Sequence, residues 1–223
     1  MKTHLICITT ILLASSLAVA EDHKIGTVKE APKGLSKDIT AKLNPAGIRI
    51  SGPDGTVCDV WLLKSLAVVP GFKPTLSVYY PLTPGQLIGA LQVPKKTVYK
   101  DFRGQELAPG IYTLRYGQQP EDGNHIGTSE LADFLLALPG KIDQSSKTIQ
   151  GFDKLASHSA KAAGSTHPAI FSLLPAEKSP KKAALKHDED NEYWVLSLPA
   201  KGKAKDKDVP VGLRFVAIGQ ALE

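Results

Sequence analysis

The sequence contains little cysteine. Cys7 and Cys58 are its two cysteines, and Cys7 lies in an amino-terminal apolar run that we expect to be removed during export. A mature chain with one cysteine forms no intramolecular disulfide, so its stability must come from its core instead of cross-links. Cys58 falls in the apolar-rich run 56–63, which predicts a buried and inert thiol.

Motifs of several enzyme classes are also missing from the sequence. It has no G-x-S-x-G nucleophile elbow and no Cys–His arrangement for nucleophilic catalysis. Gly117, Gly123 and Gly127 are too scattered to form a phosphate-binding loop. Neither nucleophilic catalysis nor nucleotide binding is therefore indicated.

The charge of the chain is mildly positive. The formal net charge of +5 includes Lys2, whose removal with the leader leaves +4, a balance that does not imply nucleic acid. Lysine-rich stretches at 177–190 and 200–208 lack interleaved aromatic side chains, and this also argues against nucleic acid. We expect both stretches to be solvated loops.

The amino terminus has the pattern of a signal peptide. A short basic start at Lys2 precedes an uncharged apolar run, and Ala18-Val19-Ala20 supplies the small residues of a cleavage site. The run is shorter than the ~20 apolar residues of a spanning helix, so no transmembrane anchor is expected after processing. The sequence predicts a signal peptide at 1–20, cleavage after Ala20, and a periplasmic or secreted mature chain of residues 21–223.

Short strand patterns separated by glycine and proline dominate the mature chain. The runs 47–51 and 57–63 flank the turn Gly52-Pro53-Asp54-Gly55 and predict a hairpin. Further strands are expected at 25–29, 86–93, 110–116, 133–138, 168–174, 193–198 and 211–218. About nine short strands predict one mainly β domain, an antiparallel two-sheet β-sandwich.

Helical patterns are few. Residues 148–163 place Ile149, Phe152 and Leu155 at helical spacing before Gly164, a good stop, and predict one peripheral helix. A shorter helix is expected at 36–43, with Ser36 as its N-cap.

The segment 118–130 carries most of the side chains that could take part in acid–base chemistry or ligand binding. It joins two predicted strands and is longer than a tight hairpin loop of ~2–5 residues. Asp122, Asn124 and His125 crowd together in it beside Glu121, and carboxylate with imidazole is material for acid–base chemistry or ligand binding. The alternative is that Asp122 and Asn124 bond their own backbone in Asx turns and that His125 packs under the loop.

His167 is the second candidate. If the segment 165–167 opens at the same end of the sandwich as the segment 118–130, His125 and His167 meet over Asp122 with Arg115 nearby. Asp122, His125 and His167 would then suit a divalent transition metal, although their spacing is no recognised metal motif. The sequence leaves the cofactor unknown, and the predicted ligand-binding residues are Asp122, Asn124, His125, His167 and Arg115.

Several of these stretches together resemble a group of exported proteins of planctomycetes, acidobacteria and related bacteria. The stretches are Asp101-Phe-Arg-Gly-Gln, Pro109-Gly-Ile-Tyr-Thr-Leu-Arg-Tyr, Pro120-Glu-Asp-Gly-Asn-His, Asp133-Phe-Leu-Leu and His167-Pro168. The resemblance covers about residues 43–174 and is poorest in the lysine-rich carboxyl-terminal third. The resemblance implies a protein of the bacterial envelope and does not indicate an activity.

These observations favour a non-catalytic binding module for a glycan or an envelope protein. β-Sandwiches present recognition loops at their ends, and the sequence has no convincing nucleophile or metal motif. The alternative is a metal-dependent hydrolase or lyase with its site at Asp122, His125 and His167.

Overall fold

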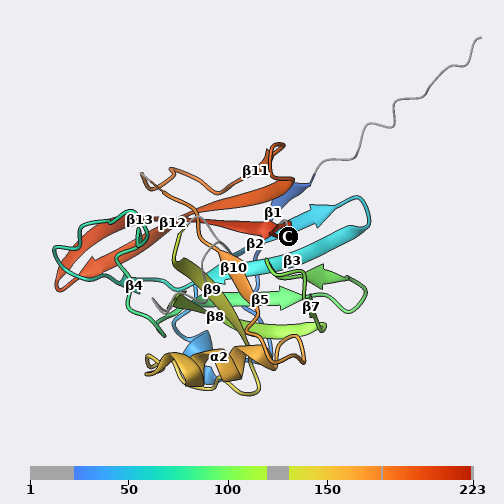
Figure 1. The fold of residues 1–223 in the computed structure, drawn as a ribbon, viewed down its shortest axis with the longest axis horizontal. Helices are drawn as coiled ribbons and strands as arrows, with labels where there is room; N and C mark the ends of the chain where they lie inside the picture. Colours follow the sequence, from blue (N-terminus) through green and yellow to red (C-terminus); the bar gives the residue numbers. More distant parts are fainter. Residues whose placement is uncertain (1–22, 120–130, 177, 222–223) are drawn as a thin grey trace, which may run out of the picture.

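The structure is a computed structural model that describes residues 23–119, 131–176 and 178–221. Its larger sheet has seven antiparallel strands (Figure 1). Their order across the sheet is β1 (Lys24–Val28), β2 (Gly47–Gly52), β3 (Gly55–Leu62), β5 (Leu87–Val93), β8 (Gly110–Gln118), β9 (Asp133–Pro139) and β10 (Ile170–Ser172). The predicted mainly β, antiparallel class is confirmed.

A smaller sheet is built around a long hairpin. Strands β12 (Tyr193–Ala204) and β13 (Lys207–Ile218) form the hairpin, and β11 (Ala184–Asp188) flanks the first half of β12. The short strand β4 (Leu66–Ala67) pairs in parallel with the distal half of β12. Strands β6 (Tyr99–Lys100) and β7 (Glu106–Leu107) form a separate pair.

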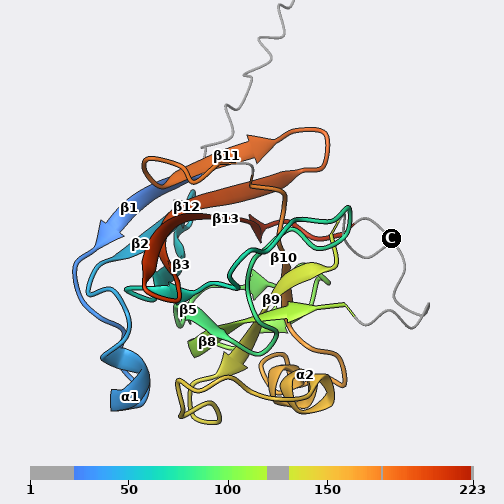
Figure 2. The ribbon, with the colours of Figure 1, turned by 90° about the vertical axis from the view of Figure 1, so that its left-hand side faces the viewer.

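One buried cluster contains residues of both larger sheets. Ile50, Cys58 and Val60 belong to it from the seven-stranded sheet, and Leu213 and Phe215 belong to it from β13. Figure 2 shows β11–β13 on one side of the seven-stranded sheet and α2 (Phe152–Ala160) on the other. The apolar faces of both sheets are therefore buried against neighbouring layers.

The first hairpin forms as the sequence predicts. In β2 and β3, Ile48 lies opposite Val60 and Ile50 opposite Cys58. The turn ends at Gly55, whose φ of +111° suits a glycine. Cys58 is fully buried, as the sequence predicts, and this burial raises the pKa of its thiol to about 12.

Helix α2 is shorter than the predicted 148–163. Ile149 is held outside the helix because its backbone N–H donates to the Gly85 carbonyl at 3.1 Å. Gly151, with a φ of +85°, then precedes the first helical residue. The other expected helix is α1 (Lys37–Thr40), and Ser36 caps it by accepting a hydrogen bond from the Ile39 N–H at 3.3 Å.

The lysine-rich stretches differ from the expected solvated loops. Residues 184–188 of the first stretch form strand β11, and 200–208 forms most of the tip of the β12–β13 hairpin. Exposed Lys201 and Lys203 alternate with buried Gly202, so the strand period is present. The buried position in 200–208 is Gly202, which has no side chain, so the sequence shows no apolar alternation there.

Among the described residues, no helix is long and apolar enough to cross a bilayer.

Candidate functional site

Most of the predicted site cannot be placed. Asp122, Asn124 and His125 lie outside the described residues. The described ends of the chain on either side are Gln119 and Leu131. Since Gln118 pairs with Asp133, the chain leaves and rejoins the seven-stranded sheet where β8 ends and β9 begins.

His167 lies toward the other end of β9. In the β9–β10 ladder, Ser172 pairs with Phe134 and Ile170 with Leu136. Continuing this antiparallel register places His167 beyond Leu136, toward the carboxyl-terminal end of β9. His167 therefore lies away from Gln119 and Leu131, the described residues that flank the other predicted segment, and the register gives no support to a shared site.

Arg115 is a buried structural residue in this fold. Its guanidinium donates two hydrogen bonds to Asp143, at 2.6 and 2.8 Å, and further ones to the Gly85, Ser145 and Lys147 carbonyls. Arg115 has no exposed surface, and these contacts use all five of its N–H donors. No donor is left for a ligand.

The described residues offer no alternative metal site. Within residues 23–119, 131–176 and 178–221, no group of three or more His, Cys, Asp or Glu side chains could hold an ion. The divalent metal that the sequence left as one alternative thus gains no support from the described part of the chain.

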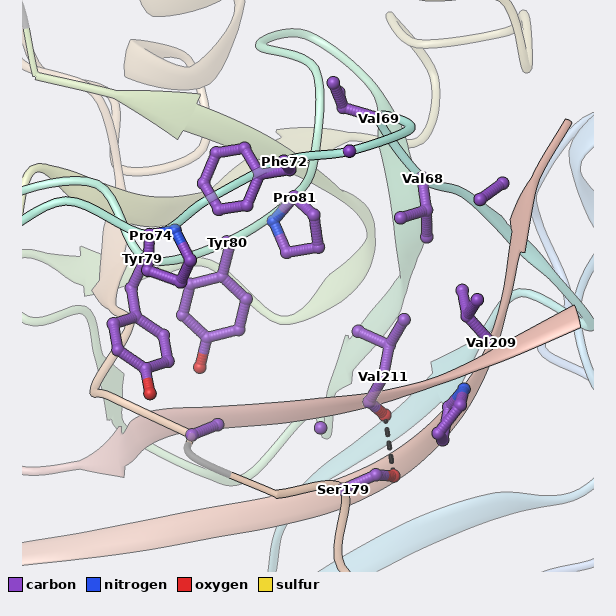
Figure 3. Close-up of a pocket in the computed structure, with 15 residues that line it drawn as sticks. Val68, Val69, Phe72, Pro74, Tyr79, Tyr80, Pro81, Ser179, Val209 and Val211 are labelled. Carbon is purple, nitrogen blue, oxygen red and sulfur yellow. Dashed lines mark hydrogen bonds between the residues drawn. The ribbon is translucent and has the colours of Figure 1, made fainter.

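A cleft of about 380 Å³ opens instead between the segment 68–81 and strand β13 (Figure 3). Its walls are aliphatic, aromatic and proline side chains. The larger side chains that line it are Val68, Val69, Phe72, Pro74, Tyr79, Tyr80, Pro81, Val209, Pro210 and Val211.

The segment 68–81 is tied to the hairpin at its start. The Val68 N–H donates to the Lys203 carbonyl at 2.9 Å, directly after the β4–β12 pairing. The Val69 N–H then donates to the Pro81 carbonyl at 3.0 Å. These bonds close the segment into a loop whose two ends lie beside each other.

Tyr80 fixes the other end of the loop. Its hydroxyl donates to the Leu174 carbonyl at 2.6 Å and accepts from the Arg214 N–H at 3.1 Å. The ring is buried, and this burial raises the pKa of its phenol above the ordinary value. Tyr80 is therefore a rigid, neutral wall of the cleft.

Asp133 holds the backbone of the same wall. One carboxylate oxygen accepts the Tyr79 N–H at 2.5 Å and the Tyr80 N–H at 3.3 Å, and the other accepts the Tyr116 hydroxyl. Burial raises the pKa of Asp133 in spite of these donors, which lower it. The first residue of β9 thus positions two aromatic side chains of the cleft.

The lining of the cleft contains few titratable side chains. Apart from the two tyrosines, its lining includes no titratable side chain. The Ser179 hydroxyl is engaged, since it donates to the Val211 carbonyl at 3.0 Å (Figure 3). A lining of this composition offers shape and apolar contact to a ligand.

Apolar side chains extend from the cleft onto the outer surface of the loop. Leu76 is fully exposed, and Val69 is 39% exposed. The charge nearby is basic, since Lys73 lies in the loop and no acidic residue occurs between Asp59 and Asp101. The loop side of the cleft is thus apolar with positive charge.

A wider hollow of about 600 Å³ lies beyond the far end of β5. It is lined by the β2–β3 turn, residues 96–100 and residues 218–220. Its Val98 is 72% exposed, and its lining includes Tyr99 and His23, whereas three aromatic rings, those of Phe72, Tyr79 and Tyr80, line the cleft. We therefore take the cleft as the candidate site.

The sequence offered only a weak signal for this cleft. Residues 68–81 have neither a helical nor a strand period, and their prolines and aromatic residues are typical of an ordinary loop. The other wall comes from β13, more than 120 residues later in the chain. A fully exposed Leu76 is visible only once the fold is known.

Comparisons of the chain with protein-family models, with curated proteins and with solved structures give no match.

Proposed function

We propose that this protein is a non-catalytic binding module, and that its cleft receives an extended apolar segment of an envelope protein. The observation that carries the proposal is the cleft itself, in which Phe72, Tyr79 and Tyr80 share one cavity with Pro74, Pro81 and Pro210.

Aromatic grooves of this kind suit proline-containing and aliphatic peptide segments. Such segments are already extended before binding and lose little conformational entropy on docking. The walls are also fixed in advance, since Asp133 and the Tyr80 hydroxyl hold one side by hydrogen bonds. A preformed site lowers the entropic cost of binding further.

Charge supports a partner with acidic flanks. Lys73 lies in the loop, and exposed Lys201 and Lys203 lie on the adjoining strand β12. Asp206 and Asp208 near the hairpin tip offset part of this charge. Complementary charge raises the association rate and selects among partners, so acidic residues beside the apolar segment are favoured.

The finer architecture and the location of the protein belong to the same proposal. We propose that the seven-stranded and four-stranded sheets are the two layers of a β-sandwich, which the shared cluster of Ile50, Cys58 and Phe215 supports. We also propose export, with cleavage after Ala20. Amino-terminal sequencing of the protein from a periplasmic or secreted fraction should find Glu21 first, and an intact Met1 on cytosolic protein would overturn this part.

The binding proposal is tested with a random library of ten-residue peptides displayed on phage and selected on immobilised residues 21–223. The enriched peptides should carry proline, aliphatic or aromatic residues at their centre and acidic residues beside them. The affinity of the most enriched synthetic peptide should fall at least tenfold in Phe72→Ala, because the ring forms part of the cavity wall.

Val98→Ala is the matched control. Val98 is also an exposed apolar side chain near lysines, at 72% exposure, but it follows β5, whereas the cleft loop precedes that strand. The control should bind the peptide as the unchanged protein does. A library without enrichment, or equal binding by Phe72→Ala, would contradict the proposal.

A further inference from the structure

A third cavity, of about 240 Å³, lies on the seven-stranded sheet. It is bounded by the chain that follows β1 and by the central strands β2, β3 and β5. Its lining combines polar and apolar side chains, which are Val28, Glu30, Ala31, Lys33, Arg49, Asp59, Trp61 and Gln92. Asp59 alternates along β3 with Cys58 and Val60, which belong to the core between the sheets, so the cavity lies on the opposite face.

Three polar side chains cross this face in register. Arg49 of β2 pairs with Asp59 of β3, and Asp59 pairs with Gln92 of β5. Neighbouring strands lie about 4.8 Å apart, so the row spans roughly 10 Å. One sugar ring with its hydroxyl groups can contact all three side chains.

The row is fixed but retains unused hydrogen-bonding capacity. Arg49 donates to both oxygens of Asp59 through Nε and Nη2, each at 2.7 Å. Nη1 of Arg49 and the whole side-chain amide of Gln92 have no hydrogen-bond partner among the described residues. Each Asp59 oxygen also keeps a lone pair beyond the one that Arg49 uses.

The charges in the cavity favour a neutral ligand. Asp59 balances Arg49, and Glu30 and Lys33 bring one charge of each sign to the rim. An anion would meet Asp59 and Glu30, and a cation would meet Arg49 and Lys33. A hydroxyl group both donates and accepts, so it can bond to the carboxylate and to the guanidinium without disturbing their ion pair.

The remaining lining is apolar, and its Trp61 is 2% exposed. The Trp61 indole is fixed, because its Nε1 donates to the Glu30 carbonyl at 3.0 Å, and Val28 and Ala31 lie beside it. A sugar ring has C–H faces as well as hydroxyl edges, so it matches a cavity with one apolar and one polar wall.

We propose that the Arg49–Asp59–Gln92 row binds one ring of a neutral glycan. This site is separate from the cleft, since it involves other residues and the face of the sheet turned away from β13. The protein would then hold an apolar protein segment at one site and a neutral glycan at the other.

The test uses residues 21–223 with cellohexaose, maltohexaose and chitohexaose as separate probes, measured by titration calorimetry and saturation-transfer NMR. At least one probe should bind to the unchanged protein. Gln92→Leu should weaken that probe about tenfold, because the lost amide supplied hydrogen bonds beside a charged pair. Gln92 is half-buried, so the variant should fold, and circular dichroism checks this.

Arg49→Lys is the second variant. It keeps the positive charge but loses the planar fork, and it should weaken the probe by a similar factor. Phe72→Ala should leave glycan binding unchanged, whereas Gln92→Leu should leave peptide binding unchanged. The peptide proposal and the glycan proposal can therefore be refuted separately. The proposal is overturned if none of the three probes binds, or if both row variants bind the glycan like the unchanged protein.

Discussion

The hydroxyl of Tyr80 accepts a hydrogen bond from the backbone N–H of Arg214 at 3.1 Å, and 134 positions separate the two residues. Through this contact the loop 68–81 is joined to β13, the strand that forms the other wall of the cleft. The width of the cleft at this end is therefore set by a hydrogen-bonded contact.

Tyr80→Phe should destabilise the protein. The change leaves the buried Leu174 carbonyl and the Arg214 N–H without the hydroxyl that satisfies them, and an unsatisfied buried group costs about 1–3 kcal/mol. Urea unfolding of the two proteins measures the difference. Tyr79→Phe is the control, since the Tyr79 hydroxyl has no partner among the described residues, and equal losses in both variants would disprove the role given to Tyr80.

Asp133→Asn should lower stability and change its dependence on pH. At neutral pH the amide cannot accept all the hydrogen bonds that Asp133 accepts from Tyr79, Tyr80 and Tyr116, so a loss of about 1–3 kcal/mol is expected.

The pH dependence follows from the raised pKa of Asp133 in the folded state. A group whose pKa is raised by folding contributes stability below its unfolded pKa of 3.8 and loses that contribution as the pH rises through the folded pKa. Relative to Asp133→Asn, the unchanged protein should therefore gain stability as the pH falls from 7 to 4. A gap between the two urea midpoints that stays constant or narrows would count against this account.

Arg115→Met should be the most damaging of these changes. It leaves the Asp143 carboxylate, which is 4% exposed, without its guanidinium partner, and breaking a buried ion pair in this way typically costs about 3–5 kcal/mol. Adding Asp143→Leu should recover part of the loss, because the uncompensated charge is then gone. If the single and double variants unfold at the same urea concentration, the buried charge is not the cause.

Local patterns explain which parts of this fold the sequence predicts. The β2–β3 hairpin is predictable because alternating side chains flank a glycine-rich turn, and α1 is predictable from Ser36. The β12–β13 tip is missed because Gly202 has no side chain to mark the buried face. A methyl group there would come within 2.6 Å of Val211 and 2.7 Å of Val68. Close packing therefore requires glycine at this position, and glycine gives no apolar residue by which the strand could be recognised in the sequence.

The candidate sites depend on contacts between distant parts of the chain. Arg115 is chemically suited to a ligand, but only the fold shows that Asp143 and three backbone carbonyls use all its donors. The cleft joins an aperiodic loop to a late strand, and the Arg49–Asp59–Gln92 row exists only in the register of three strands. No local pattern contains this information.

The most direct test of the central claim is the position of the selected peptide on the protein. In a titration of ¹⁵N-labelled residues 21–223 with this peptide, followed by NMR, the backbone signals of Phe72, Tyr79, Val209 and Val211 should shift in proportion to saturation. Signals of Thr97 and Val98, which line the 600 Å³ hollow, should stay in place. Shifts confined to that hollow, with the cleft signals unchanged, would contradict the account.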